Sequence, residues 1–188
     1  MSDLPLSQRL LDADRRLLVL MRTAGHAPAL ERSAAAYSKL GEHAAIWIAL
    51  GLAGALGDRR PGRRRLWLRG GATVVGAYGL NFAVKLAVRR RRPELRDLPP
   101  LTPTVSRLSF PSAHATTSFA GAAVYRGLGP TGWLYAAAIA FGLTRPYLGV
   151  HYPSDVLAGA ALGTAVGEMA RRRDGAGLLG RDGGAGCR

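Results

Sequence analysis

Cysteine, lysine and acidic residues are all scarce in this sequence of 188 residues. The one cysteine, Cys187, can form no disulfide within the chain, and its place in a Gly- and Arg-rich end argues against a catalytic thiol. Only Lys39 and Lys85 are lysines, so arginine supplies nearly all of the positive charge. Asp and Glu number 12 in total and form no paired cluster of the kind that holds Mg²⁺. The composition therefore excludes a disulfide within the chain, and the acidic residues give no sign of a magnesium site.

Nothing in the chain has the composition of a linker between two domains, and its length suits one domain with a sizeable core. A secretory signal is not expected either, because Asp3 replaces a basic start and no long apolar segment follows it. We expect three parts: an amphipathic helical segment at 1–42, a transmembrane domain at 43–170 and a flexible Gly- and Arg-rich tail at 171–188.

Apolar residues make up 48% of the chain although its formal net charge is +14. Small apolar residues dominate the stretches 44–57, 66–88, 113–125, 131–150 and 156–170. A soluble Ala-rich bundle would carry a charged stripe on each surface helix, whereas here the arginines gather at the ends of the stretches. Several stretches are shorter than the ~20 apolar residues that cross a bilayer. We predict an all-α integral membrane bundle of about five transmembrane helices with an amphipathic helical segment before it.

Two segments have a residue spacing that indicates how their helices would pack. In LSQRLLDADRRLLVLMRTAG the leucines recur at helical spacing, as in a helix that lies on a membrane surface or packs across the mouth of the bundle. Near the other end, Gly159, Gly163 and Gly167 line one helix face with small residues, which lets a neighbouring helix approach closely.

The excess of arginine predicts a polyanionic partner, either nucleic acid or an anionic lipid surface. Because the arginines flank apolar stretches, we expect membrane lipids and no nucleic acid, and a multi-pass protein of the plasma membrane. Lys and Arg are balanced between the two expected faces, and no pattern indicates self-association. The sequence thus assigns neither a membrane side to the polar groups described next nor an oligomeric state.

Two groups of polar residues do not suit an apolar bundle. In KLAVRRRRP, Lys85 still lies inside the second apolar stretch, and we interpret Arg89 to Arg91 beyond it as a basic cap at the membrane interface. In SFPSAHATTSF, a helix is expected to begin near Ser112, and its free N–H groups would form a site for an anion beside His114. The alternative is that Ser112 and His114 merely cap that helix.

A third group occurs in TRPYLGVHYPSD. Arg145 ends the fourth apolar stretch, and Pro153 opens a helix that has Asp155 in its first turn, just after His151. His151 and Asp155 could simply occupy a turn between two helices. If successive stretches cross the membrane in alternate directions, however, all three groups meet on one face.

Together these residues can perform phosphoryl transfer. One lysine and two arginines supply positive charge for phosphate oxygens. One imidazole can attack phosphorus while the other protonates the leaving oxygen and later activates water. Asp155 can hold the attacking imidazole in the required tautomer and stabilise its positive charge.

The same motifs resemble the type 2 phosphatidic acid phosphatase (PAP2) superfamily. Lys85 with RP at Arg92 matches K-x6-R-P, PSAH is similar to P-S-G-H, and TRPYLGVHYPSD is similar to S-R-x5-H-x3-D. The signatures occur in the family's order within residues 40–170. Ala113 stands where the family usually has glycine and Thr144 where it has serine, and Ala113 restricts backbone freedom beside the phosphate site.

The resemblance implies roles for individual residues. His151 would be the nucleophile, His114 the general acid and then the general base, and Asp155 the residue that orients His151. The resemblance also implies a set of residues that bind the phosphoryl group: Lys85, Arg92, Ser112, Ala113 and Arg145. It implies no metal and no other cofactor. His26 and His43 match no motif, so we expect them to be structural or interfacial.

The resemblance also implies a particular substrate. The short chain, its amphipathic start and the strings LSFPSAHATTSFA and LGVHYPSDV are similar to small actinobacterial members that act as decaprenylphosphoryl-5-phosphoribose phosphatases in cell-wall arabinan synthesis. Undecaprenyl diphosphate, phosphatidylglycerophosphate and phosphatidic acid are the alternatives within the family. A non-enzymatic basic membrane protein that binds anionic lipids would explain the arginines but not the grouping of two histidines with an aspartate.

Overall fold

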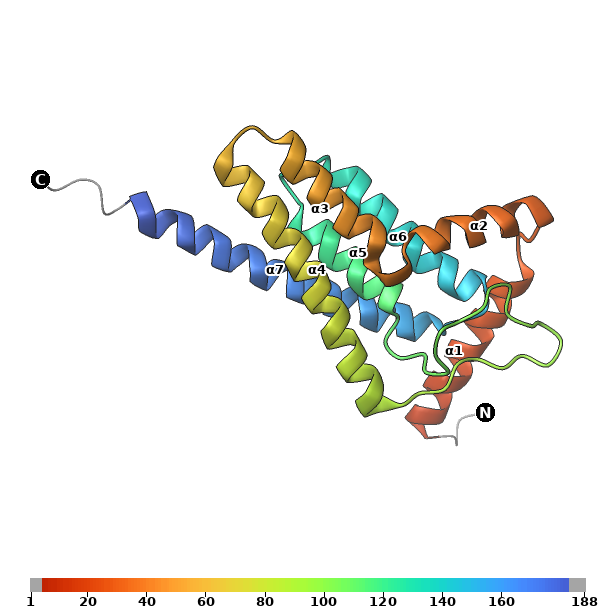
Figure 1. The fold of residues 1–188 in the computed structure, drawn as a ribbon. Helices are drawn as coiled ribbons and strands as arrows, with labels where there is room; N and C mark the ends of the chain where they lie inside the picture. The colour runs from red at the N-terminus through yellow and green to blue at the C-terminus, as the bar shows by residue number, and fades with distance from the viewer. Residues whose placement is uncertain (1–4, 183–188) are drawn as a thin grey trace, which may run out of the picture.

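Helices account for nearly all of the regular structure in residues 5–182, the part of the chain that the computed structural model describes (Figure 1). In chain order they are α1 (Leu6–Thr23), α2 (Pro28–Leu40), the 3₁₀ helix η1 (Glu42–Ala44), α3 (Ala45–Gly57), α4 (Pro61–Val88), α5 (Ala113–Val124), α6 (Thr131–Tyr147) and α7 (Pro153–Asp182). The prediction of an all-α bundle is confirmed.

Helix α5 lies at the centre of the bundle and packs against α4, α6 and α7 (Figure 1). Its first residue follows Ser112, which caps the helix, and most of its side chains are buried. Small residues dominate the sequence AHATTSFAGAAV, so its neighbours can approach on all sides. Because α5 is enclosed by its neighbours, the residues at its start are held in fixed positions.

The glycine stripe of α7 faces α5. A Cβ atom added at Gly159 would lie 2.6 Å from the carbonyl oxygen of Ser112, and one at Gly163 would lie closer still to the backbone of Thr116. The close helix approach predicted from this stripe is therefore confirmed. Beside it, the backbone N–H of Ser112 donates to the carbonyl of Asp155 at 2.9 Å. The starts of α5 and α7, which carry two of the three motifs, are thus held together.

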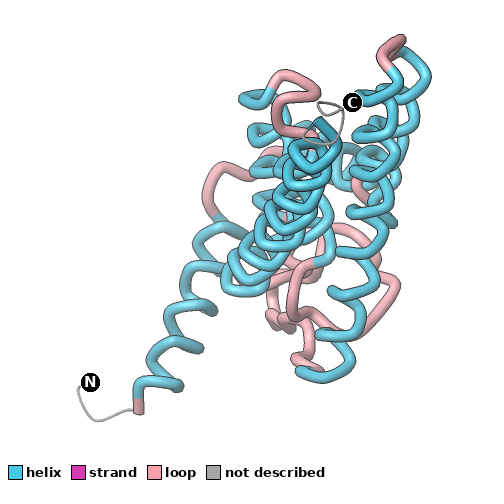
Figure 2. Tube along the Cα trace, turned by 90° about the vertical axis from the view of Figure 1, so that its left-hand side faces the viewer, coloured by secondary structure: helices cyan, strands magenta, loops and turns pink. Residues whose placement is uncertain are grey.

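The amphipathic segment forms two helices rather than one. The chain turns between α1 and α2 at Gly25, which has a left-handed φ of +70°. Helix α1 packs against α6 and α7, and α2 packs against α6. Figure 2 shows α1 projecting obliquely from one end of the bundle. The segment therefore packs across the bundle, which is one of the two placements expected from the sequence. Helix α1 still exposes several leucines: Leu10, Leu11, Leu17 and Leu20.

Among the described residues, α4 alone is long and apolar enough by itself to cross a membrane. A second candidate span arises if α2 and the η1–α3 segment, which meet at a bend of 48°, are counted as one. Helices α3, α5 and α6 are shorter than the ~20 residues that a bilayer core requires.

Helix α7 continues well beyond the end expected at residue 170. It runs to Asp182, so residues 171–182 are helical where the sequence led us to expect a flexible Gly- and Arg-rich tail. Arg69 of α4 pairs with Asp174, which joins the first turn of this extension to the bundle. The remaining tail, with Cys187, lies outside the described residues.

Candidate active site

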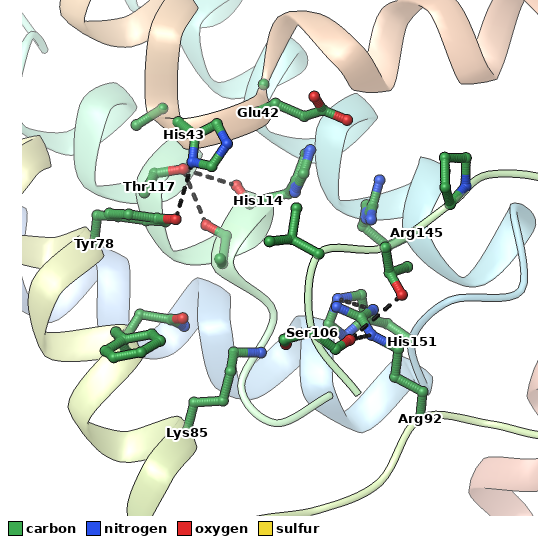
Figure 3. Close-up of a pocket in the computed structure, with 18 residues that line it drawn as sticks. Glu42, His43, Tyr78, Lys85, Arg92, Ser106, His114, Thr117, Arg145 and His151 are labelled. Carbon is green, nitrogen blue, oxygen red and sulfur yellow. Dashed lines mark hydrogen bonds between the residues drawn. The ribbon is translucent and has the colours of Figure 1, made fainter. Parts of the chain in front are cut away.

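One pocket collects most of the predicted site residues at the end of the bundle where α4 and α6 finish and α5 and α7 begin (Figure 3). It encloses about 810 Å³ of empty space, counting its open mouth. The predicted residues that line it are Lys85, Arg92, Ala113, His114, Arg145 and His151. Ser112 and Asp155 are fully buried and do not line it.

His151 presents one ring nitrogen to a cation and the other to a carboxylate. Its Nε2 lies 3.0 Å from Arg92 Nη1, and its Nδ1 lies 3.4 Å from Asp155 Oδ2. A guanidinium can only donate, so Nε2 must be the acceptor and the proton resides on Nδ1, facing Asp155. Burial, together with the charges of Arg92, Arg145 and Lys85, lowers the pKa of His151 well below its usual range. The ring is therefore neutral at pH 7, with a free electron pair on Nε2.

Asp155 is held on both carboxylate oxygens. Oδ2 accepts the backbone N–H of Tyr152 at 2.9 Å, and Oδ1 accepts from Arg90 Nη1 at 2.8 Å. Arg90 in turn reaches Asp14 of α1, with 2.7 Å between Nη2 and Oδ2. The interpretation of Arg90 as part of an interfacial basic cap is therefore wrong, while Arg89 and Arg91 are exposed, as such a cap would be.

Three cations face the pocket, each anchored by a hydrogen bond to another part of the chain. Lys85 Nζ donates to the carbonyl of Leu108 at 3.1 Å, and Arg92 Nε donates to that of Ser106 at 2.7 Å. Burial lowers the pKa of Arg92 to about 10, which leaves it cationic at pH 7. Arg145 donates to the hydroxyl of Ser38. This arrangement places three fixed positive charges around one pocket.

His114 is positioned by the N-terminal segment. Its Nε2 lies 3.0 Å from the carbonyl oxygen of Ser38 in α2. A carbonyl only accepts, so Nε2 carries a proton and Nδ1 is the ring atom left for proton exchange. The ring also packs so closely on Gly41 that a Cβ there would lie 2.9 Å from its Cδ2. Sequence reasoning missed Ser38, because one serine on an amphipathic helix has no pattern that identifies a contact more than 70 positions away.

The start of α5 supplies backbone rather than a serine hydroxyl to the pocket. The Ser112 side chain caps the helix by accepting from the N–H of Ala115 at 3.5 Å. Ala113, the first helical residue, lines the pocket without a left-handed φ. Alanine is therefore accommodated at the position where the family usually has glycine.

Polar and aromatic residues form part of the remaining wall of the pocket, among them Glu42, His43 and Tyr78 (Figure 3). His43 Nδ1 lies 3.2 Å from the hydroxyl of Tyr78. The backbone of His43 is left-handed at φ 52°, a conformation that costs a non-glycine residue energy and tends to occur at functional sites. We expected a structural or interfacial role for His43, and the structure places it at the pocket. His26 lies outside the pocket, stacked on Tyr147 at a centroid distance of 4.0 Å.

In the described part of the chain, no group of three or more His, Cys, Asp or Glu side chains is arranged to hold a metal ion. The pocket instead has donors and positive charges, which are suited to phosphate oxygens.

The chain is similar in sequence to known phosphatases. A decaprenylphosphoryl-5-phosphoribose phosphatase from Mycolicibacterium smegmatis is 40% identical over 162 residues, which cover 85% of this chain and 84% of the relative.

Two solved structures have a similar fold. LpxE from Aquifex aeolicus matches with a TM-score of 0.68 at 23% identity, covering 92% of this chain and 98% of that one. A transmembrane PAP2-type phosphatidylglycerolphosphate phosphatase from Bacillus subtilis matches with a TM-score of 0.66, also at 23% identity, covering 88% and 86%. A sequence model of the PAP2 superfamily matches residues 66–173, more than half of the chain. The chain belongs to the PAP2 superfamily.

Proposed function

We propose that this protein is a membrane-embedded, metal-independent lipid phosphate phosphatase that works through a phosphohistidine on His151. The observation that carries the proposal is the placement of the His151 ring, with Nδ1 3.4 Å from Asp155 Oδ2 and Nε2 3.0 Å from Arg92 Nη1. That arrangement suits nucleophilic attack by Nε2 on a phosphate held among the three cations.

In the first step, Nε2 attacks phosphorus, the N–P bond forms and the P–O bond to the leaving group breaks. Arg92 exchanges its contact with Nε2 for a phosphate oxygen, and Lys85 and Arg145 neutralise the remaining charge. His114, which takes up a proton on Nδ1 together with the anionic substrate, gives that proton to the leaving oxygen. Asp155 stabilises the positive charge that develops on the His151 ring.

In the second step, water attacks the phosphohistidine while His114 takes its proton. The N–P bond breaks, inorganic phosphate leaves and His151 regains its starting form. The backbone N–H groups at the start of α5, next to Ala113, supply further donors for the phosphate oxygens. In this proposal Ser112 acts through the helix that it caps.

We propose a polyprenyl-linked phosphosugar, decaprenylphosphoryl-5-phosphoribose, as the substrate. The name of the relative from M. smegmatis supports this choice, because the identity extends over 85% of the chain. The pocket wall formed by Glu42, His43 and Tyr78 supports it as well, since a carboxylate, an imidazole and a phenol can hydrogen-bond to sugar hydroxyls. The protein would be a multi-pass protein of the plasma membrane, with its active site reached by a lipid.

A substrate panel tests the proposal. The purified protein in detergent would be assayed with EDTA for release of phosphate from decaprenylphosphoryl-5-phosphoribose, undecaprenyl diphosphate, phosphatidylglycerophosphate and phosphatidic acid. We expect release in EDTA and a preference for the phosphosugar lipid. A preference for another member would refute the substrate, and activity that is lost in EDTA and restored by Mg²⁺ would contradict the metal-free mechanism. Absence of turnover on all four would favour a non-enzymatic protein that binds anionic lipids.

A further inference from the structure

A line of alternating charges runs from the N-terminal helix to the candidate nucleophile. It passes from Asp14 on α1 through Arg90 to Asp155 on α7, and from there to His151. The side chains of Asp14 and Asp155 are 8% and 0% exposed and that of Arg90 is 20% exposed, so the charges are largely shielded from water. The proposed mechanism uses only the last two members.

Arg90 is fixed on several sides. Its two terminal nitrogens engage different carboxylates, Nη1 with Asp155 and Nη2 with Asp14, and Nη1 also donates to the hydroxyl of Ser154 at 2.7 Å. The guanidinium carbon lies 4.0 Å from the centre of the Tyr152 ring, a cation–π distance. A planar guanidinium held in this way defines the direction from which Asp155 Oδ1 is bound.

Asp14 is held equally well. Its Oδ1 accepts the backbone N–H of Ser154 at 3.0 Å, and its Oδ2 accepts the Ser154 hydroxyl. A carboxylate at the first turn of a helix interacts favourably with the free N–H groups there, so Asp14 binds the start of α7 from outside that helix. Helix α1 is thereby joined to the same turn that contains Asp155.

Asp155 requires a cationic partner such as Arg90. A fully buried carboxylate with a single backbone donor is costly to keep ionised, and a protonated Asp155 could not stabilise a positive His151 ring. Arg90 supplies the charge that compensates Asp155, and its bond to Oδ1 leaves Oδ2 directed at His151 Nδ1.

We propose that Arg90 is a positioning residue for the phosphatase reaction, held in place by Asp14, and that helix α1 is therefore part of the catalytic apparatus. Arg90 touches neither substrate nor the reacting atoms and acts through Asp155. The inference rests on the proposed function, because it assigns His151 as the nucleophile.

The test compares Arg90→Gln, Arg90→Lys and Asp14→Asn with Arg91→Gln, a matched control at the next, exposed arginine. Turnover is measured with p-nitrophenyl phosphate and with the lipid of the substrate panel on which the unchanged protein is most active. We expect Arg90→Gln to lower kcat by about 10–100-fold with little change in KM. Losses of this size are typical when a residue that orients a functional side chain through a hydrogen bond is removed. Arg90→Lys should recover part of this loss, Asp14→Asn should lose less than Arg90→Gln, and Arg91→Gln should match the unchanged protein.

Two readouts separate positioning from simple stabilisation of the fold. In an Asp155→Asn background, Arg90→Gln should cost no more than about twofold further, because residues that act through one another are not additive. The acidic limb of the kcat profile should move to higher pH in Arg90→Gln, since Asp155 then binds a proton more easily. A kcat within twofold of the unchanged protein, a loss that adds in full to that of Asp155→Asn, or an unmoved limb would overturn the proposal.

A spectroscopic measurement keeps this inference separate from the proposed function. Ring ¹⁵N resonances of His151 report its tautomer whether or not the protein turns over. We expect the Nδ1–H form in the unchanged protein and a mixture of tautomers in Arg90→Gln and Asp14→Asn. Identical spectra in all of them would refute the role of Arg90, whereas the expected shift without any phosphate release would refute only the proposed function.

Discussion

His151 Nε2 and Arg92 Nη1 lie 3.0 Å apart, in a contact that fixes the tautomer of the histidine and covers its free electron pair with a cation. The same nitrogen of Arg92 also donates to the carbonyl of Val150 at 2.7 Å, so the arginine is anchored beside the ring before any substrate arrives. An incoming phosphate can take over the guanidinium and meet Nε2 in the same movement.

The two histidines should fail at different steps. His151→Ala should abolish turnover and leave no covalent intermediate. His114→Ala should be nearly inactive on a lipid substrate, because general acid catalysis is typically worth about 10²–10⁴-fold when the leaving oxygen is poor. With an activated aryl phosphate, however, His114→Ala should form phosphohistidine and then stall. Rapid-quench labelling with ³²P checks this, and label on His114 or in His151→Ala would show the roles to be wrong.

Asp155→Asn should fold and lose most of the rate. An asparagine of equal size cannot stabilise the positive ring, and the corresponding change in a catalytic triad costs about 10⁴-fold in kcat. Circular dichroism and thermal unfolding of the variant in detergent are the controls for folding. A variant that retains a tenth of the rate would argue that Asp155 is structural.

The lowered pKa of His151 predicts how activity and stability depend on pH. Because the folded protein holds the ring neutral, kcat/KM should show no loss from protonation of His151 until well below the ordinary pKa of about 6.5. The unfolded chain binds a proton at this residue near pH 6.5 and the folded chain does not, so the free energy of unfolding should fall as the pH drops below that value. In His151→Gln this part of the dependence should be absent, as thermal unfolding measured from pH 5 to 8 would reveal. Equal slopes in the two proteins would contradict the shift.

The contact between α5 and α7 should tolerate no side chain at Gly163. A Cβ there would overlap the backbone of Thr116, so Gly163→Ala should destabilise the protein by about 1–3 kcal/mol and reduce activity by displacing the start of α7. Gly76→Ala in α4 is the matched control, because nothing lies within 4 Å of its added Cβ. That substitution should leave stability unchanged or raise it by about 0.5–1 kcal/mol. Similar melting temperatures for the two variants would count against the tight contact.

Ser38→Ala tests the contribution of α2. It removes the hydroxyl that accepts from Arg145 but keeps the backbone carbonyl that binds His114. The loss of one hydrogen bond to a charged group, worth about 1.5–3 kcal/mol, should lower kcat/KM by about 10–150-fold. Ser33→Ala on the exposed face of the same helix is the control and should have no effect. A kcat/KM unchanged in Ser38→Ala would show that Arg145 is held by other groups.

Much of this arrangement could be predicted from the sequence because it is recorded in short, local patterns. Proline and serine mark the helix starts near His114 and Asp155, and a four-residue spacing of glycines marks the contact surface of α7. Alternation of the apolar stretches then suffices to place Lys85, His114 and His151 at one end of the bundle.

The features that could not be predicted from the sequence depend on contacts between side chains far apart in the chain. Arg90 is separated from Asp155 by 65 positions and from Asp14 by 76, and no local spacing distinguishes it from the arginines on either side. The extension of α7 past residue 170 is a similar case, because Arg69 pairs with Asp174 from another helix. Only packing decides which arginines in the run from Arg89 to Arg92 are shielded from water.

The position of Asp14 has a consequence for inhibition. The pocket itself favours compounds with the charge of a phosphate, and such compounds cross membranes poorly. The contact between Asp14 and Arg90 lies outside that pocket, and Asp14 belongs to α1, a helix with exposed leucines. A lipophilic ligand that separated these two residues would disturb Asp155 without entering the cationic pocket or imitating a phosphate.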